Sequence, residues 1–178
     1  MRQTFYFAAL AMIATSAHAA NPADRAEAPR TLATAQVADP TGAPLGTARI
    51  IGGKDHPRLE VDLKGISAGV HGMHFHSVGA CSGAAFADAG PHLNPANHQH
   101  GTLNPMGSHL GDLPNVTADA AGRVHESIEL PMTAGALLAA VIDQNGTALV
   151  LHAGPDDYRT DPAGASGARI ACGVFKKT

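Results

Sequence analysis

Histidines gathered in four stretches constrain this 178-residue chain more than any other feature. Six histidines and one aspartate stand in these stretches at spacings that can hold two transition-metal ions. The residues are His74, His76, His92, His100, His109, Asp112 and His152. Any fold for this chain therefore has to bring together segments that are well separated in the sequence.

The first and last of these stretches favour copper. His74 and His76 lie two residues apart in an expected strand, where period-2 geometry places both side chains on one face. An H-x-H pair alone is weak evidence, because most such pairs are ordinary surface or core histidines. His152 ends an apolar run and can supply a further ligand. Four ring nitrogens in a flattened arrangement favour copper, and the lack of thiolate ligands argues against a blue-copper centre.

The middle stretches favour zinc. His92 stands in a stiff turn flanked by prolines, and His100, His109 and Asp112 follow in the same segment. A His/His/His/Asp set suits a tetrahedral zinc ion. Two alternatives stay open at this point. The segment can be a solvated histidine-rich loop that binds metals loosely, and His98 can take the place of His100 on spacing alone.

Composition indicates one globular domain that does not bind nucleic acid. Hydrophobic residues make up 44% of the chain, which is enough for a core, and the absence of Trp leaves that core to Val, Leu, Ile and Ala. Charged residues amount to only 15%, and the formal net charge is -3. The mildly acidic balance and the lack of a basic arm exclude nucleic acid as a partner.

The N-terminus has the pattern of a secretory signal peptide. Arg2, a short apolar run and the small-x-small site Ala17-His18-Ala19 predict export and cleavage. The alternative is a membrane anchor, but the run is short for a bilayer span. We therefore expect a signal peptide at 1–19, a flexible leader at 20–30 and one domain at 31–178. The mature protein is then periplasmic rather than extracellular, with no membrane attachment.

The chain has two cysteines, Cys81 and Cys172. In an oxidising compartment an even pair predicts one disulfide, which in the chain-entropy model stabilises the fold by roughly 4–5 kcal/mol. The alternative is a pair of free buried thiols. A thiol–redox role is not favoured, because the sequence has no C-x-x-C motif.

Seven stretches have the alternation of β-strands, and no long amphipathic helix stands out. The expected strands are 31–37, 45–51, 59–64, 70–76, 123–130, 147–152 and 168–175. Two long segments rich in Gly and Pro, 77–114 and 153–167, interrupt them and hold candidate site residues. Loops this long in a compact domain are usually functional or disordered. We predict an all-β fold, an antiparallel sandwich or barrel with two long functional loops.

The histidine stretches also belong to longer motifs. These are Gly72-Met73-His74-Phe75-His76, Gly90-Pro91-His92-Leu93-Asn94-Pro95, His100-Gly101, His109-Leu110-Gly111-Asp112-Leu113-Pro114-Asn115, Leu151-His152 through Asp156, and Gly167-Ala168-Arg169-Ile170-Ala171-Cys172-Gly173-Val174. In this order, over roughly residues 31–175, the chain resembles copper,zinc superoxide dismutase of the exported bacterial kind. The resemblance implies a Greek-key β-sandwich or flattened barrel, copper and zinc ions as cofactors, and dismutation of superoxide to dioxygen and hydrogen peroxide.

The resemblance implies a role for each candidate residue. The residues at the copper-ligand positions are His74, His76, His92 and His152. The residues at the zinc-ligand positions are His92, His100, His109 and Asp112. His92 then bridges the two ions, and family position favours His100 over His98 because a glycine follows His100. Asp156 corresponds to the carboxylate that ties a zinc ligand to a copper ligand.

The resemblance extends to the anion site and to the disulfide. Arg169 corresponds to the guanidinium that docks the anion beside copper, so Arg169 and His92 are the expected catalytic residues. Cys81 and Cys172 correspond to the intrasubunit disulfide. The charges of residues 157–161 differ from those of the animal enzymes, which leaves the strength of electrostatic steering open.

Two other functions compete with the enzyme. An exported copper/zinc carrier on the same fold, without dismutase activity, would tolerate the loss of Arg169 or of a copper ligand, yet no such position is missing here. A secreted binding module would have scattered histidines instead of an ordered set. A homodimer is possible, but the sequence does not decide between a monomer and a dimer.

Overall fold

The computed structural model describes residues 29–178, and these form two antiparallel sheets. The predicted signal peptide and most of the predicted leader lie outside the described residues. One sheet has seven strands in the order β5-β8-β9-β1-β2-β3-β7, and the other pairs β4 with β6. The strands are β1 (Thr31–Ala38), β2 (Pro44–Ile51), β3 (Arg58–Leu63), β4 (Gly69–His71), β5 (Met73–His76), β6 (Val116–Ala118), β7 (Val124–Glu129), β8 (Ala148–His152) and β9 (Arg169–Lys177). The predicted all-β antiparallel class is confirmed.

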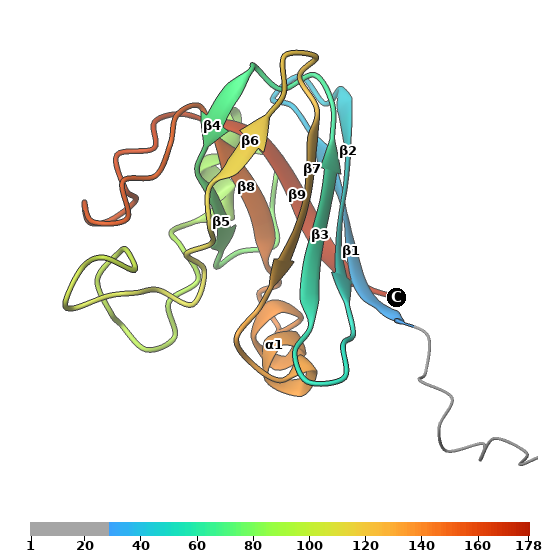
Figure 1. Ribbon diagram of the computed structural model, residues 1–178, viewed down its shortest axis with the longest axis vertical. Helices are drawn as coiled ribbons and strands as arrows, with labels where there is room; N and C mark the ends of the chain where they lie inside the picture. Colours follow the sequence, from blue (N-terminus) through green and yellow to red (C-terminus); the bar gives the residue numbers. More distant parts are fainter. Residues whose placement is uncertain (1–28) are drawn as a thin grey trace, which may run out of the picture.

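The large sheet curls, and its strand order crosses the sequence order (Figure 1). β9 lies between β8 and β1, so the last strand joins the first strand to the pair β5–β8. β4 and β6 stand beside β7 in Figure 1, across the open side of the curl. The strands β5, β8 and β9, which carry candidate site residues, are therefore neighbours in one sheet.

β3 shows why these sequences form strands. Leu59, Val61 and Leu63 are buried, while Glu60 and Asp62 lie on the outer face. This is the alternation that the sequence predicts for a strand with one dry face. Burying each such aliphatic side chain contributes about 1.5–3 kcal/mol. The same face of the sheet continues into one hydrophobic core that all the long strands share.

The single strand expected over 70–76 is instead two short strands. β4 ends at His71 and β5 begins at Met73, because the backbone of Gly72 bonds to the second long segment and to the end of β8. Its N–H donates to the Gly154 carbonyl at 2.8 Å, and its carbonyl accepts from the His152 N–H at 2.9 Å. The strand β6 was not expected from the sequence.

A short helix, α1 (Ala134–Val141), was also not expected. The Thr133 side chain caps its N-terminus by accepting from the Ala136 N–H at 3.2 Å. Alanine and leucine favour helix, and Leu137 and Val141, four residues apart, are buried against the core. No helix among the described residues is long and apolar enough to cross a membrane.

The two long segments pack against each other beside β5 and β8. We call 77–114 the first loop and 153–167 the second loop. The first loop contains one short 3-10 element, η2 (Ala84–Ala89). The His100 N–H donates to Asp161 Oδ1 at 2.6 Å, and the Leu103 N–H donates to the Tyr158 carbonyl at 3.0 Å. The loops are thus joined to each other as well as to the sheet.

Candidate metal centre

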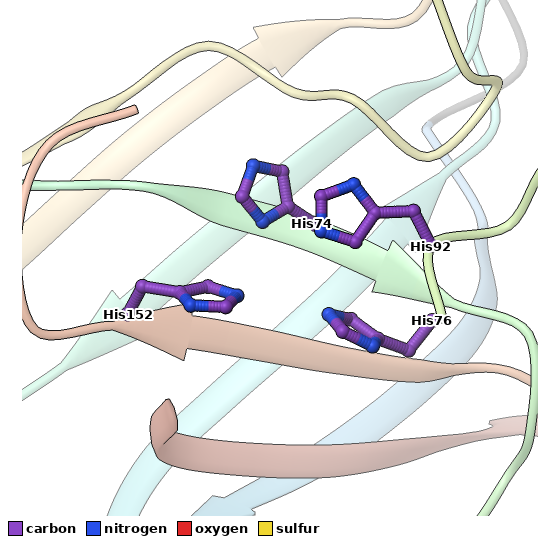
Figure 2. Close-up of side chains that lie close together, drawn as sticks. All are labelled: His74, His76, His92 and His152. Carbon is purple, nitrogen blue, oxygen red and sulfur yellow. The ribbon is translucent and has the colours of Figure 1, made fainter. Parts of the chain in front are cut away.

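Four buried histidines converge at the edge of the large sheet (Figure 2). β5 carries His74 and His76 on one face, and β8, its antiparallel partner, ends at His152. The first loop brings His92 to them through a β-bridge with His76. The candidate ligand atoms of the four rings lie within 4.8 Å of one another. We call this set the copper cluster.

Each ring of the copper cluster has one bonded and one unbonded nitrogen. The unbonded, buried atoms are His74 Nδ1, His76 Nε2, His92 Nε2 and His152 Nε2. His76 Nδ1 donates to the Gly90 carbonyl at 2.8 Å, and His152 Nδ1 donates to the Gly167 carbonyl at 3.1 Å. Since a neutral imidazole protonated at one nitrogen has a lone pair at the other, the opposite nitrogens are free to bind an ion. Four convergent ring nitrogens without a thiolate fit copper.

Burial keeps the rings of the copper cluster neutral. It lowers the pKa of His74 and His152 to about 4, and that of His76 to about 2. Neutral imidazole is the form that ligates a metal, so no proton has to be removed from these three rings near neutral pH.

A second set gathers around one carboxylate oxygen of Asp112. Asp112 Oδ1 lies 2.9 Å from His92 Nδ1, 3.0 Å from His100 Nδ1 and 3.1 Å from His109 Nδ1. The other oxygen, Oδ2, accepts from the N–H groups of Gly101 and His109, each at 2.9 Å. Three ring nitrogens and one carboxylate, held by the backbone, fit a tetrahedral zinc ion. We call this set the zinc cluster.

His92 belongs to both sets. Its Nε2 faces the copper cluster and its Nδ1 faces the zinc cluster. The ring of His74 stacks on that of His92, with ring centroids 3.9 Å apart. One imidazole with both nitrogens directed at separate ligand sets can bridge two ions.

Asp156 connects the two sets by a second route. This fully buried carboxylate accepts from His74 Nε2 through Oδ2 at 2.7 Å and from His100 Nε2 through Oδ1 at 2.9 Å. Burial acts to raise the pKa of Asp156, but the hydrogen bonds from His100 and His74 hold it well below its usual range. An ionised Asp156 therefore fixes the orientation of one ring in each cluster.

Arg169 stands at the mouth of the copper cluster. It lines a cavity of about 630 Å³ together with His76, His92 and His152. Its Nη1 donates to the Phe86 carbonyl at 2.6 Å and its Nη2 to the Gly90 carbonyl at 2.7 Å. Among the described residues that line this cavity, Arg169 is the only one with a formal charge. Apart from the three histidines, the other lining residues are alanine, glycine and proline.

Comparison with known proteins identifies the family of this fold and site. The family model for copper/zinc superoxide dismutase matches residues 45–175. The chain belongs to the copper/zinc superoxide dismutase family. It is 40% identical over 149 residues to a Cu-Zn superoxide dismutase of Caulobacter vibrioides, covering 81% of this chain and 85% of that protein. It is 37% identical over 147 residues to Cu-Zn superoxide dismutase 2 of Aquifex aeolicus, covering 81% and 86%.

Solved structures agree with this assignment. The Cu/Zn superoxide dismutase from Brucella abortus has a TM-score of 0.66 and 32% identity, covering 80% of this chain and 98% of that one. A superoxide dismutase-like protein from Bacillus subtilis has a TM-score of 0.73 and 34% identity, covering 79% and 96%. The copper,zinc superoxide dismutase family predicted from the sequence is therefore confirmed.

The structure brings together the residues that the sequence predicted for the dismutase site, and it leaves His98 outside. His98 is exposed, and its Nδ1 donates to the Ser108 carbonyl at 3.0 Å. His100 is fully buried in the zinc cluster. The structure also explains why glycine follows His100. Gly101 has φ +101°, and a side chain there would overlap the Tyr158 carbonyl. Cys81 and Cys172 form a disulfide, as predicted.

Sequence reasoning missed several groups that support the dismutase site. His71 is buried, with Nδ1 2.7 Å from the His152 carbonyl and Nε2 2.8 Å from the Ser67 carbonyl. Asn115 brackets Asp156, since its amide donates to the Asp156 carbonyl and accepts from the Asp156 N–H, both at 2.9 Å. Asn115 ends a family motif, which was a usable signal. Nothing in the local sequence marked His71, which stands outside the ligand spacing.

Proposed function

We propose that this protein dismutates superoxide to dioxygen and hydrogen peroxide, using the two clusters as a copper site and a zinc site. The proposed copper ligands are His74, His76, His92 and His152. The proposed zinc ligands are His92, His100, His109 and Asp112. In the balanced reaction, two superoxide anions and two protons give one dioxygen and one hydrogen peroxide.

One observation carries this proposal. Four buried ring nitrogens without a hydrogen-bond partner converge beside a cavity that also exposes a guanidinium. Unpaired buried polar atoms cost about 1–3 kcal/mol each, so a fold retains four of them together only where a ligand satisfies them. Copper held by these nitrogens would supply the one-electron chemistry, and zinc held by His92, His100, His109 and Asp112, which has no redox role, would order the first loop.

Arg169 binds and orients the substrate. A guanidinium has five N–H groups, and hydrogen bonds to the Phe86 and Gly90 carbonyls use two of them. These bonds hold the planar group at the cavity wall, so its remaining N–H groups and its charge favour a small anion next to His76 and His152. Apart from these histidines and His92, the other lining residues are alanine, glycine and proline, whose side chains offer the anion no competing hydrogen bond.

His92 is the proposed proton carrier. Its Nδ1 faces Asp112 at 2.9 Å, and its Nε2 faces the copper cluster at the cavity wall. His92 can therefore hold a proton at Nε2 while Nδ1 keeps its place in the zinc cluster. A proton held there lies beside the position where Arg169 docks the anion, so it can be delivered to the forming peroxide.

We also propose that the protein acts in the periplasm after cleavage of residues 1–19, as a single domain over 31–178. The signal-peptide pattern and the disulfide between Cys81 and Cys172 support this location, because disulfides persist in oxidising compartments. The rival proposal of a metal carrier is less well supported, since every position of both clusters and Arg169 is present.

The test is to measure metal content and superoxide-dismuting activity together on protein purified from the periplasm, before and after addition of copper and zinc. We expect one copper and one zinc per chain, with activity proportional to copper. His152→Ala should abolish activity and leave zinc bound. Both metals bound without activity would favour the carrier, and full activity in His152→Ala would contradict the copper assignment.

A further inference from the structure

Gly164, in the second loop, packs directly on the carboxylate that links the two clusters. It is buried and has φ +64°, in the left-handed region that favours glycine. Its N–H donates to the Thr160 carbonyl at 2.6 Å, and its carbonyl accepts from the Asp157 N–H at 3.0 Å. The second bond ties Gly164 to the residue next to Asp156, so the position of its α-carbon relative to that side chain is fixed.

A side chain at position 164 has no room. A Cβ atom there would overlap Asp156 Oδ1 and lie 2.7 Å from His100 Nε2. These two atoms are the partners of the 2.9 Å hydrogen bond between Asp156 and His100. The bare α-carbon of Gly164 therefore packs directly against this hydrogen bond.

The contacts of an added Cβ lie mainly on the His100 side of the bridge. They are Oδ1 and Cγ of Asp156 and Nε2 of His100, whereas Oδ2, which bonds to His74 Nε2 at 2.7 Å, is not among the three nearest atoms. His74, His100 and Asp156 are close enough to one another to bind an ion of their own. Because the other ring nitrogens, His74 Nδ1 and His100 Nδ1, belong to the copper cluster and the zinc cluster, we treat this trio as a bridge between the two clusters.

We propose that Gly164 is a positioning residue of the bimetal centre, which holds the Asp156 carboxylate in the place where it bonds His100. The inference rests on the proposed function, in which His100 is a zinc ligand. Partners of metal-bound histidines affect metal affinity by about 10–100-fold. Displacing the carboxylate from His100 should therefore weaken zinc binding, and it should weaken copper binding less, because an added Cβ contacts His100 directly while no His74 atom is among its nearest contacts.

The first experiment compares Gly164→Ala with Gly42→Ala. Gly42 is a matched control, because it also has positive φ (+85°) but has no neighbouring atom within 4 Å of an added Cβ. Zinc and copper affinities are measured by competition with chromogenic chelators. We expect Gly164→Ala to bind zinc about tenfold more weakly than Gly42→Ala, with a smaller loss for copper. Equal zinc affinities in the two variants would overturn the proposal.

The second experiment separates positioning from backbone strain. In Asp156→Ala the carboxylate is gone, so the two closest contacts of an added methyl group are removed, and of its three nearest atoms only His100 Nε2, at 2.7 Å, remains. We expect adding Gly164→Ala to Asp156→Ala to cause no further loss of zinc affinity. A loss as large as in the otherwise unchanged chain would mean that backbone strain or the contact with His100 is responsible and not the carboxylate, and the proposal would be wrong.

Whether these variants fold also tests the proposal. If Gly164→Ala does not fold while the double variant with Asp156→Ala does, the clash with the carboxylate is demonstrated. If both fail to fold, backbone strain is decisive and the proposal fails. Failure of the proposed function would look different. In that case the unchanged chain would bind zinc and copper without dismutase activity, and the zinc affinities of the two glycine variants could still be compared.

Discussion

His76 and Arg169 share one hydrogen-bond acceptor, the Gly90 carbonyl. His76 Nδ1 donates to this oxygen at 2.8 Å and Arg169 Nη2 at 2.7 Å. A residue of the first loop thus fixes both a proposed copper ligand and the proposed anion-docking group. The position of the Arg169 guanidinium relative to His76 therefore depends on one peptide unit, and the following prediction depends on this geometry.

Replacing Arg169 should slow the reaction without removing copper. Arg169 is not a member of either cluster, and a hydrogen bond to a charged group contributes about 1.5–3 kcal/mol, so Arg169→Ala should lower kcat/KM roughly 10- to 100-fold. Arg169→Lys should restore the charge but not the two carbonyl bonds, and so recover only part of the loss. Stopped-flow kinetics at several ionic strengths, with copper content as the control, would test this.

The dependence of the reaction rate on ionic strength gives a second test of the role of Arg169. Since Arg169 is the only formally charged residue among the described residues lining the cavity, its removal should flatten the dependence of rate on ionic strength. An unchanged salt dependence in Arg169→Ala would mean that charges outside the cavity steer superoxide.

The disulfide should support both the fold and the docking geometry. It links Cys81 in the first loop to Cys172 on β9, the strand that begins at Arg169, with a sequence separation of 91 residues. Replacing both cysteines with alanine should cost about 4–5 kcal/mol in the chain-entropy model. Activity should fall as well, because Phe86 and Gly90, whose carbonyls hold Arg169, lie in the segment that the disulfide restrains.

Chemical denaturation and kinetics on the metal-loaded double cysteine variant would measure these two effects. Full activity per bound copper, despite the lower free energy of unfolding, would show that the Phe86 and Gly90 carbonyls stay in place without the disulfide.

Much of the sheet could be predicted from sequence because one-sided burial leaves an alternating pattern. β3 follows that pattern from Leu59 to Leu63. The break at Gly72 could not be predicted, since it depends on a hydrogen bond to Gly154 in the second loop. Helix α1 is only eight residues long and its sequence is apolar nearly throughout, so its helical period does not show.

In the candidate site too, some groups could be predicted from the sequence and others could not. Histidine and carboxylate ligands are few and chemically distinctive, so their spacing and the family motifs mark them. The groups that hold them are often backbone atoms, such as the Phe86 and Gly90 carbonyls, and backbone atoms have no sequence signal. Gly164 lies among several glycines of a loop without periodicity, and only the packing against Asp156 distinguishes it.

Zinc binding should distinguish His100 from His98, which spacing alone could not. His100 is buried with Nδ1 3.0 Å from Asp112, while His98 is exposed and bonds to the Ser108 carbonyl. His100→Ala should weaken zinc binding by well over tenfold, because a ligand is lost and ligand partners alone are worth about 10–100-fold. His98→Ala is the matched control and should bind zinc normally. A strong loss in His98→Ala instead would reverse the assignment.

The stability of the metal-free protein should pass through a maximum near pH 6.5. Burial lowers the pKa of His74 and His152 from 6.5 to about 4 and that of His76 to about 2. Below pH 6.5 the unfolded chain therefore takes up protons that the folded chain does not, and the free energy of unfolding falls as the pH decreases towards 4.

On the alkaline side, His100 has the opposite effect. Burial lowers its pKa, but hydrogen bonds to the carboxylates of Asp112 and Asp156 outweigh burial and raise it to about 9. Its contribution is complete below pH 6.5 and is lost as the pH rises from 6.5 to 9. Urea unfolding of chelator-treated protein between pH 4 and 9 would show the maximum. His100→Ala should remove the decline above pH 6.5 and keep the acid one, whereas an unchanged alkaline decline would assign it to another group.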